Sequence, residues 1–151
     1  MKELNEILRS EAIGLGLCQQ WQSDWRANKN TGELIEMFKR GIDFCLEHRW
    51  PSCEFIKANF DKVELHDHNV YVGENVTGTV LSDGVAVIRE CNGVIHTGRN
   101  SVTTIHCQDS KIISIKAGRG ARVFLHLYNS TVERIEEDMH SVVKVYNHND
   151  L

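Results

Sequence analysis

The chain has 151 residues, the length of one domain or of one domain with a small appendage. Charged residues make up 25% of it and apolar residues 41%, as in an ordinary soluble protein, and the single proline argues against disorder. The net charge of −4 disfavours a general duplex-binding protein, because such proteins carry a basic excess, so we expect no nucleic-acid partner.

The apolar pattern and the cysteines indicate a cytoplasmic protein. No apolar run approaches the roughly 20 residues that cross a bilayer, and the first residues are too polar for a secretory signal. The five cysteines are scattered and form no C-x-x-C pair, which is typical of small buried side chains in a reducing compartment. We therefore expect a cytoplasmic location, no membrane association and no cofactor.

Residues 1–60 are predicted to form a helical cap segment. Apolar residues recur at helical spacing from Leu4 to Trp21 and predict one amphipathic helix. Gly14 and Gly16 weaken the middle of that helix by roughly 1 kcal/mol each relative to alanine.

Two further helices are expected in this segment. Residues 26–30 have the composition of a loop, and Thr31 is a plausible N-cap for a second helix. That helix should stop just before Pro51, because proline disfavours helical geometry in the preceding residue. Ser52 can cap a third, short helix that ends near Asn59.

Residues 61–151 are predicted to form short strands. Segments rich in β-branched and aromatic residues alternate with glycines that mark turns, and no segment between them has room for a crossover helix. The expected strands include residues 63–66, 69–72, 85–88, 122–127 and 142–146.

A repeat of 20 residues specifies how these strands are arranged. Asp109–Ile115 aligns with Asn129–Ile135, and Ile95 falls on the column that ends both segments. A constant period in this range is typical of a solenoid, in which each coil stacks on its neighbours. The fold class is therefore α+β: an N-terminal helical cap followed by a short parallel β-solenoid with coils of about 20 residues.

The same period predicts which side chains share a column. Neighbours on a strand face opposite sides, so the residues between two apolar columns should point outward. One apolar column contains Val85, Ile105, Leu125 and Val145; another contains Val87, Cys107 and Leu127; the outward column contains Ala86, His106, His126 and Tyr146; and a polar corner contains Asp109, Asn129 and Asn149.

The two ends of a solenoid need cover, because open strand edges invite pairing. We expect the helical segment to cover the first coil. No comparable cap is visible between the strand at 142–146 and Leu151. The open end should therefore be covered by self-association with a second copy or by a protein partner.

Histidines supply the first candidate site. Seven of the eight lie after residue 61, and the outward positions of His106 and His126 make them a candidate metal site. A metal site needs three or four converging ligands, and two stacked histidines supply half of one. His66 and His68, expected on one strand face, are a second weak signal. The alternative interpretation is an exposed interaction face.

Arg99 and Arg119 supply the second candidate. They fall on one column at a glycine-rich corner, where guanidinium groups and backbone N–H groups could bind an anion or a partner. The alternative interpretation is a solvated turn.

The sequence contains no pattern that indicates a catalytic site. It contains no phosphate loop, nucleophile elbow or zinc-protease helix. Glu136–Asp138 has the composition of an acidic surface turn. A parallel β-helix could cleave polysaccharides, but four coils make a stack only about 20 Å tall, with little room for several sugar subsites.

Several segments resemble a family of uncharacterised proteins from gut anaerobes and from their bacteriophages and mobile elements. The segments are Glu11–Trp21, Arg40–Leu46 and Trp50–Ser52, and Val123–Tyr128 is similar to repeat strands in that family. The resemblance covers most of the chain. It implies a helical N-terminus, a β-repeat C-terminus and a phage or mobile-element context, and it carries no activity and no catalytic residues.

The function favoured by the sequence is a non-enzymatic interaction or structural protein that binds a protein partner through the faces of its solenoid. Two alternatives stay open. One is a small-ligand or metal-binding module, and the other is a carbohydrate-active β-helix protein.

Overall fold

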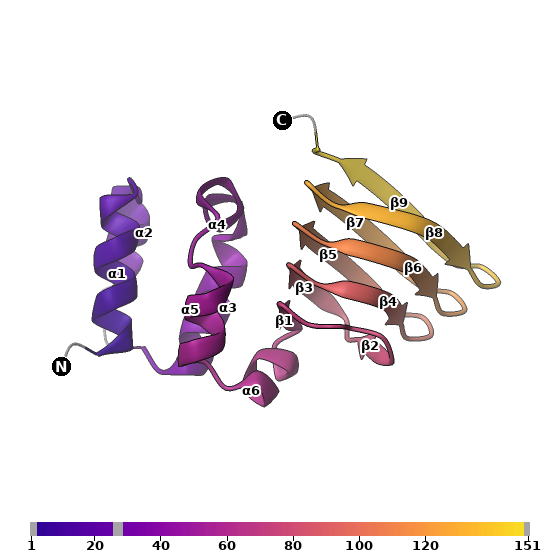
Figure 1. Cartoon of the computed structure of the whole chain (residues 1–151), viewed down its shortest axis with the longest axis horizontal. Coiled ribbons are helices and arrows are strands. Elements are labelled where there is room, and N and C mark those ends of the chain that lie inside the picture. The colour runs from indigo at the N-terminus through magenta and orange to yellow at the C-terminus, as the bar shows by residue number, and fades with distance from the viewer. Residues whose placement is uncertain (1–2, 26–28, 150–151) are drawn as a thin grey trace. The chain divides into compact units, whose positions relative to one another are not determined.

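The computed structural model describes residues 3–25 and 29–149 (Figure 1). The chain divides into two compact units, Met1–Glu64 and Leu65–Leu151. Helices form the first unit and parallel strands wound into a β-solenoid form most of the second, so the predicted α+β fold is confirmed. Within the described ranges, no helix has both the length and the apolar character needed to cross a membrane.

The helix predicted from Leu4 to Trp21 is two helices, α1 (Leu4–Gly14) and α2 (Gln19–Asp24). Gly14 ends α1, and Gly16 adopts a φ of +99°, a conformation that glycine tolerates and other residues rarely adopt. The loop predicted at 26–30 includes residues 26–28, which lie outside the described residues.

The helix predicted to follow is also interrupted. The predicted cap Thr31 is instead the first residue of α3 (Thr31–Arg40), and the N-cap is Asn30, whose side chain accepts a hydrogen bond from Glu33 N at 2.8 Å. The Glu33 side chain in turn accepts from Asn30 N at 3.1 Å, which completes a capping box. Gly41 separates α3 from α4 (Ile42–His48).

The third predicted helix is confirmed. Ser52 Oγ accepts a hydrogen bond from Phe55 N at 3.1 Å and caps α5 (Cys53–Asn59). One hydrophobic cluster of the first unit joins α1 to α3. Its buried members are Leu8, Ala12, Trp25, Leu34 and Met37.

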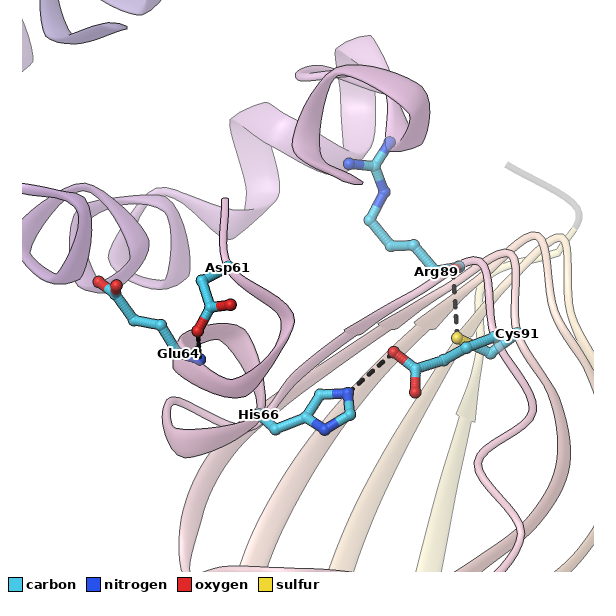
Figure 2. Close-up of polar contacts among 6 residues, drawn as sticks. Asp61, Glu64, His66, Arg89 and Cys91 are labelled. Atoms are coloured by element: carbon cyan, nitrogen blue, oxygen red, sulfur yellow. Dashed lines mark hydrogen bonds and ion pairs between the residues drawn. The ribbon is translucent and has the colours of Figure 1, made fainter. Parts of the chain in front are cut away.

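The prediction of a strand at 63–66 is wrong, because these residues belong to helix α6 (Lys62–Asp67). Asp61 Oδ2 accepts a hydrogen bond from Glu64 N at 3.2 Å, which supports the first turn of α6 (Figure 2). This local cap outweighs the strand preference of one β-branched residue. His66 therefore lies on a helix, and it does not share a strand face with His68.

The second unit winds through two parallel sheets, one strand from each per coil (Figure 1). Sheet A has the order β1-β3-β5-β7-β9 and sheet B the order β2-β4-β6-β8. The strands are β1 (Val70–Val72), β2 (Thr79–Leu81), β3 (Gly84–Arg89), β4 (Asn92–Thr97), β5 (Val102–Gln108), β6 (Lys111–Ala117), β7 (Arg122–Tyr128), β8 (Thr131–Glu137) and β9 (Val142–Asn147).

The predicted period of 20 holds in the later coils. Paired residues are 20 apart between β5 and β7, between β7 and β9, and between β6 and β8. They are 17 apart between β1 and β3 and 19 apart between β3 and β5. The column Ile95, Ile115, Ile135 is confirmed, as are the columns Ile105, Leu125, Val145 and Cys107, Leu127.

Both apolar columns are shifted by one residue where they reach β3. Ala86, predicted to point outward, pairs with Ile105 and is fully buried, whereas Val87 pairs with His106. The physical reason is that a β-bulge at Ile113 in β6 adds one residue to the coil from β5 to β7, whereas the coil from β3 to β5 runs through β4 and lacks that residue. A one-residue change exchanges the two faces of a strand.

One corner of the solenoid requires left-handed backbone. A residue with positive φ follows each sheet A strand from β1 to β7. These residues are Gly73, Glu90, Asp109 and Asn129, with φ between 50° and 60°. Asn129 Nδ2 donates to Asp109 Oδ1 at 2.7 Å, so the polar corner predicted at these two positions forms a hydrogen bond from coil to coil.

Buried serines continue this corner from coil to coil. Cys91 N donates to Ser110 Oγ at 3.0 Å, Ser110 N to Ser130 Oγ at 3.1 Å, and Ser130 N to Asn149 Oδ1 at 2.9 Å. We call Ser110 and Ser130 the serine ladder. Each serine satisfies a backbone N–H of the preceding coil that has no strand partner there.

Candidate interaction face

Five aromatic side chains form two neighbouring stacked columns on the outer face of sheet A. They come from β5, β7, β9 and the residue that follows β9, and residues along these strands alternate between the core and the outside. The members of this aromatic ladder are His106, His126, Tyr128, Tyr146 and His148. The first two were predicted to be outward neighbours, and the register pairs them directly.

The rings of the aromatic ladder are nearly parallel. The ring centroids of His106 and His126 are 5.1 Å apart with planes at 17°, and those of His126 and Tyr146 are 4.6 Å apart at 10°. In the neighbouring column, Tyr128 and His148 stack at 4.6 Å and 8°. A spacing near 4.8 Å is the separation of neighbouring strands, so the backbone itself sets the stacking distance.

A hydrogen bond joins the two columns. His126 Nδ1 lies 3.1 Å from His148 Nε2, so one imidazole donates its N–H and the other accepts it. Lys144 Nζ lies 5.3 Å from the Tyr146 ring centroid and adds a cation–π contact at the upper end. The ladder is therefore a rigid surface that presents polar ring edges and one cation.

The structure brings together the two histidines predicted as metal ligands, but it stacks them face to face. Imidazole nitrogens bind metal in the plane of the ring, and the planes of His106 and His126 lie one above the other. In the part of the chain that the structure describes, no group of three or more His, Cys, Asp or Glu side chains could hold a metal ion. His66 lies elsewhere, with its Nε2 2.9 Å from Glu74 Oε2 (Figure 2).

The two arginines predicted as an anion site occupy equivalent turns of successive coils. Both Arg99 and Arg119 are exposed. The backbone N–H groups that follow them bond to the next coil, from Asn100 N to Arg119 O at 2.9 Å and from Gly120 N to Met139 O at 3.0 Å. These two N–H groups are therefore not directed at a ligand, and anion binding would depend on the guanidinium groups.

A shallow depression lies on the outer face of sheet B, beside a column formed by His96, Lys116 and Glu136. Ser114 Oγ donates to Glu136 Oε2 at 2.7 Å, and Lys116 Nζ lies 3.9 Å from the same oxygen. The Ser114 hydrogen bond and the positive charge of Lys116 lower the pKa of Glu136. A general acid in glycoside hydrolysis needs the opposite shift.

The last coil exposes side chains that are buried one coil below. Ile115 and Leu125 are fully buried, whereas their column partners Ile135 and Val145 are 39% and 41% exposed. β8 and β9 are edge strands, each with a hydrogen-bonded neighbour on one side only among the described strands. The upper edges of β8 and β9 are therefore unpaired by any other described strand.

Three of the five members of the aromatic ladder were predicted to share one outward column, and the other two were missed. Tyr128 and His148 are 20 residues apart, so the period already indicated that they share a column. His96, Lys116 and Glu136 on sheet B carry the same signal.

Comparison of the chain with protein-family models, with curated proteins and with solved structures finds no match to any of them. The proposals that follow therefore depend on the geometry of the solenoid and on the side chains it displays.

Proposed function

We propose that the protein is a non-enzymatic interaction protein that binds a protein partner through the outer face of sheet A. The aromatic ladder is the observation that carries this proposal. Its five rings span three coils and are held at strand spacing. Aromatic side chains with polar edges are enriched at protein interfaces because they supply contact area at a low cost in side-chain entropy.

The arrangement of the rings suits recognition better than catalysis. Each ring is braced by the ring above or below it, so little side-chain freedom remains to be lost when a partner binds. The ring nitrogens and hydroxyl groups at the edges offer hydrogen bonds, and Phe124, half-buried beside His126 on β7, adds apolar area. The partner surface should therefore combine apolar contacts with hydrogen-bonding groups.

The test is affinity capture from the native cell with two variants. His126→Ala with Tyr128→Ala removes rings from the middle of the ladder without touching the core. Ile113→Ser is the matched control, because Ile113 is a 45% exposed apolar residue on the outer face of sheet B. We expect one set of proteins to be captured by the wild type and by Ile113→Ser and to be lost from the ladder variant.

Two outcomes would contradict the proposal. One is equal capture by the ladder variant and the wild type. The other is equal loss from both variants, which would indicate a general effect on the fold. Thermal melting of both variants by circular dichroism establishes that the solenoid is intact before capture is compared.

We further propose that the protein works in the cytoplasm, in a phage or mobile-element context. The cytoplasmic location is supported by the five cysteines, none of which forms a disulfide. The context is supported by the sequence resemblance alone. Fractionation of native cells with an antibody to the protein tests the location, and recovery of the protein outside the cytoplasmic fraction would overturn it.

A further inference from the structure

We propose that a second copy of the chain covers the open end of the solenoid, with β8 pairing antiparallel to β8 and β9 to β9 of the other copy. This contact goes beyond the proposed function, because it uses the strand edges of the last coil in place of the outer face of sheet A. The two copies would be related by a two-fold axis that crosses both strands.

The backbone of the last coil is oriented for such pairing. Val142 N donates to Ala121 O at 2.9 Å and His148 N to Leu127 O at 2.8 Å, both in the preceding coil, and backbone groups alternate in direction along a strand. The N–H groups of Val143 and Val145 therefore point toward the open edge. Val143 N already donates to Glu137 Oε2 at 3.1 Å, which a strand from a second copy would replace.

The side chains of β8 are self-complementary in one antiparallel register. The β-bulge that begins at Ile113 continues here, so Glu133 and Arg134 both lie on the outer face between the inward Val132 and Ile135. Setting Glu133 opposite Arg134 of the second copy also sets Val132 opposite Ile135. Two salt bridges outside and two aliphatic pairs inside result from the symmetry.

β9 is self-complementary about Val145. With Val145 at the two-fold axis, Lys144 of one copy lies opposite Tyr146 of the other. This cation–π pairing is one that the two side chains already make within a chain, at 5.3 Å. It would bring the two aromatic ladders end to end on one face.

One axis can serve both strands. The centre of the β8 register, between Glu133 and Arg134, lies between three and four residues before Glu137, the last residue of β8. Val145 lies three residues after Val142, the first residue of β9. Both crossing points are therefore at a similar distance from the turn that connects the strands. An unrelated partner would need to reproduce both complementarities, whereas a second copy supplies them by symmetry.

Sedimentation of the whole protein across concentrations up to about 100 µM tests the proposal, since this range includes weak dimers. We expect the wild type to dimerise. Arg134→Glu sets Glu133 against a second glutamate and should weaken the dimer by about tenfold or more, as should Glu133→Arg. Lys111→Glu, a charge reversal at an exposed residue in an interior coil, is the matched control and should dimerise as the wild type does.

Mixing the two failing variants gives the decisive measurement. In a heterodimer of Glu133→Arg with Arg134→Glu, each arginine lies opposite a glutamate, so dimerisation should return to near the wild-type level. The double variant Glu133→Arg/Arg134→Glu should also dimerise. A monomeric wild type, or single variants that dimerise normally, or a mixture that does not recover, would overturn the proposal. Partner capture by a monomeric protein would leave the proposed function standing.

Discussion

At the residue scale, the stacking of the coils depends on turn positions where the next coil leaves no room for a side-chain Cβ atom. Gly98 and Gly118 occupy equivalent turns of successive coils and are not interchangeable. A Cβ added at Gly118 would lie 2.7 Å from Thr97 O and 3.0 Å from Gly98 C, both of them backbone atoms. A Cβ added at Gly98 would meet only Val80 Cγ1, at 4.0 Å. The turn at Gly118 therefore has no room for a Cβ atom, whereas the equivalent turn at Gly98, one coil earlier, has room for one.

Gly118→Ala should lower the free energy of unfolding by about 1–3 kcal/mol, because the backbone must move to admit the methyl group. Gly98→Ala should change it by less than about 1 kcal/mol, and could raise it by restricting the unfolded chain. Urea unfolding of both variants measures the difference. Equal losses would show that the turns of the two coils are packed alike.

At the element scale, the strands are joined by corner contacts as much as by their own pairing. The serine ladder shows this most clearly. Ser130 Oγ accepts from Ser110 N at 3.1 Å and lies 3.0 Å from Cys107 O and from Tyr128 O, to which it donates. Both serines are almost completely buried, so no water can replace the hydroxyl group without a rearrangement.

Ser130→Ala should destabilise the protein by about 1–3 kcal/mol, because it leaves the N–H of Ser110 buried without its acceptor. Ser101→Ala is the control. Ser101 is also buried, but its hydroxyl group donates to Gly98 O at 2.6 Å, within its own turn. Amide hydrogen exchange gives a local readout, and exchange at Ser110 should become faster only in Ser130→Ala. Unchanged exchange at Ser110 would contradict this role.

The period of 20 residues allowed the later elements to be predicted and failed in the earlier ones for a physical reason. Between β5 and β9 every coil has the same length, so counting along the sequence places His106 beside His126. The bulge at Ile113 changes the spacing between paired residues of β4 and β6 by one residue. No residue type in that segment indicates a bulge. Residues 63–66 were predicted to form a strand but belong to α6. The first turn of this helix is supported by the hydrogen bond from Glu64 N to the Asp61 side chain.

At the scale of the whole molecule, the core of the second unit holds ionisable groups away from water. Burial raises the pKa of the Cys91 and Cys107 thiols to about 11 and also raises that of Tyr71. Cys91 Sγ donates to Arg89 O at 3.2 Å (Figure 2). The folded protein therefore holds these protons more tightly than the unfolded chain does.

The stability contributed by the thiols should be complete below pH 9, the pKa of an unfolded thiol, and should be lost as the pH rises toward 11. The loss is of the order of 1–3 kcal/mol for each thiol over this window. Urea unfolding at several pH values measures it. Cys107→Ala should show a shallower decrease than the wild type, and an equal decrease in the two proteins would contradict the assignment.

The constant spacing of the later coils also bears on how such a chain can change in length. Duplicating residues 109–128 in tandem would add one whole coil, because paired residues from β5 to β9 are all 20 apart. The copied segment would bring its own serine, its own left-handed corner and one more histidine and tyrosine for the outer face. An insertion whose length is not a multiple of 20 would break all three patterns at once. Growth by whole coils therefore follows from the constant spacing of the C-terminal coils, whereas the first coils have unequal spacings of 17 and 19 residues.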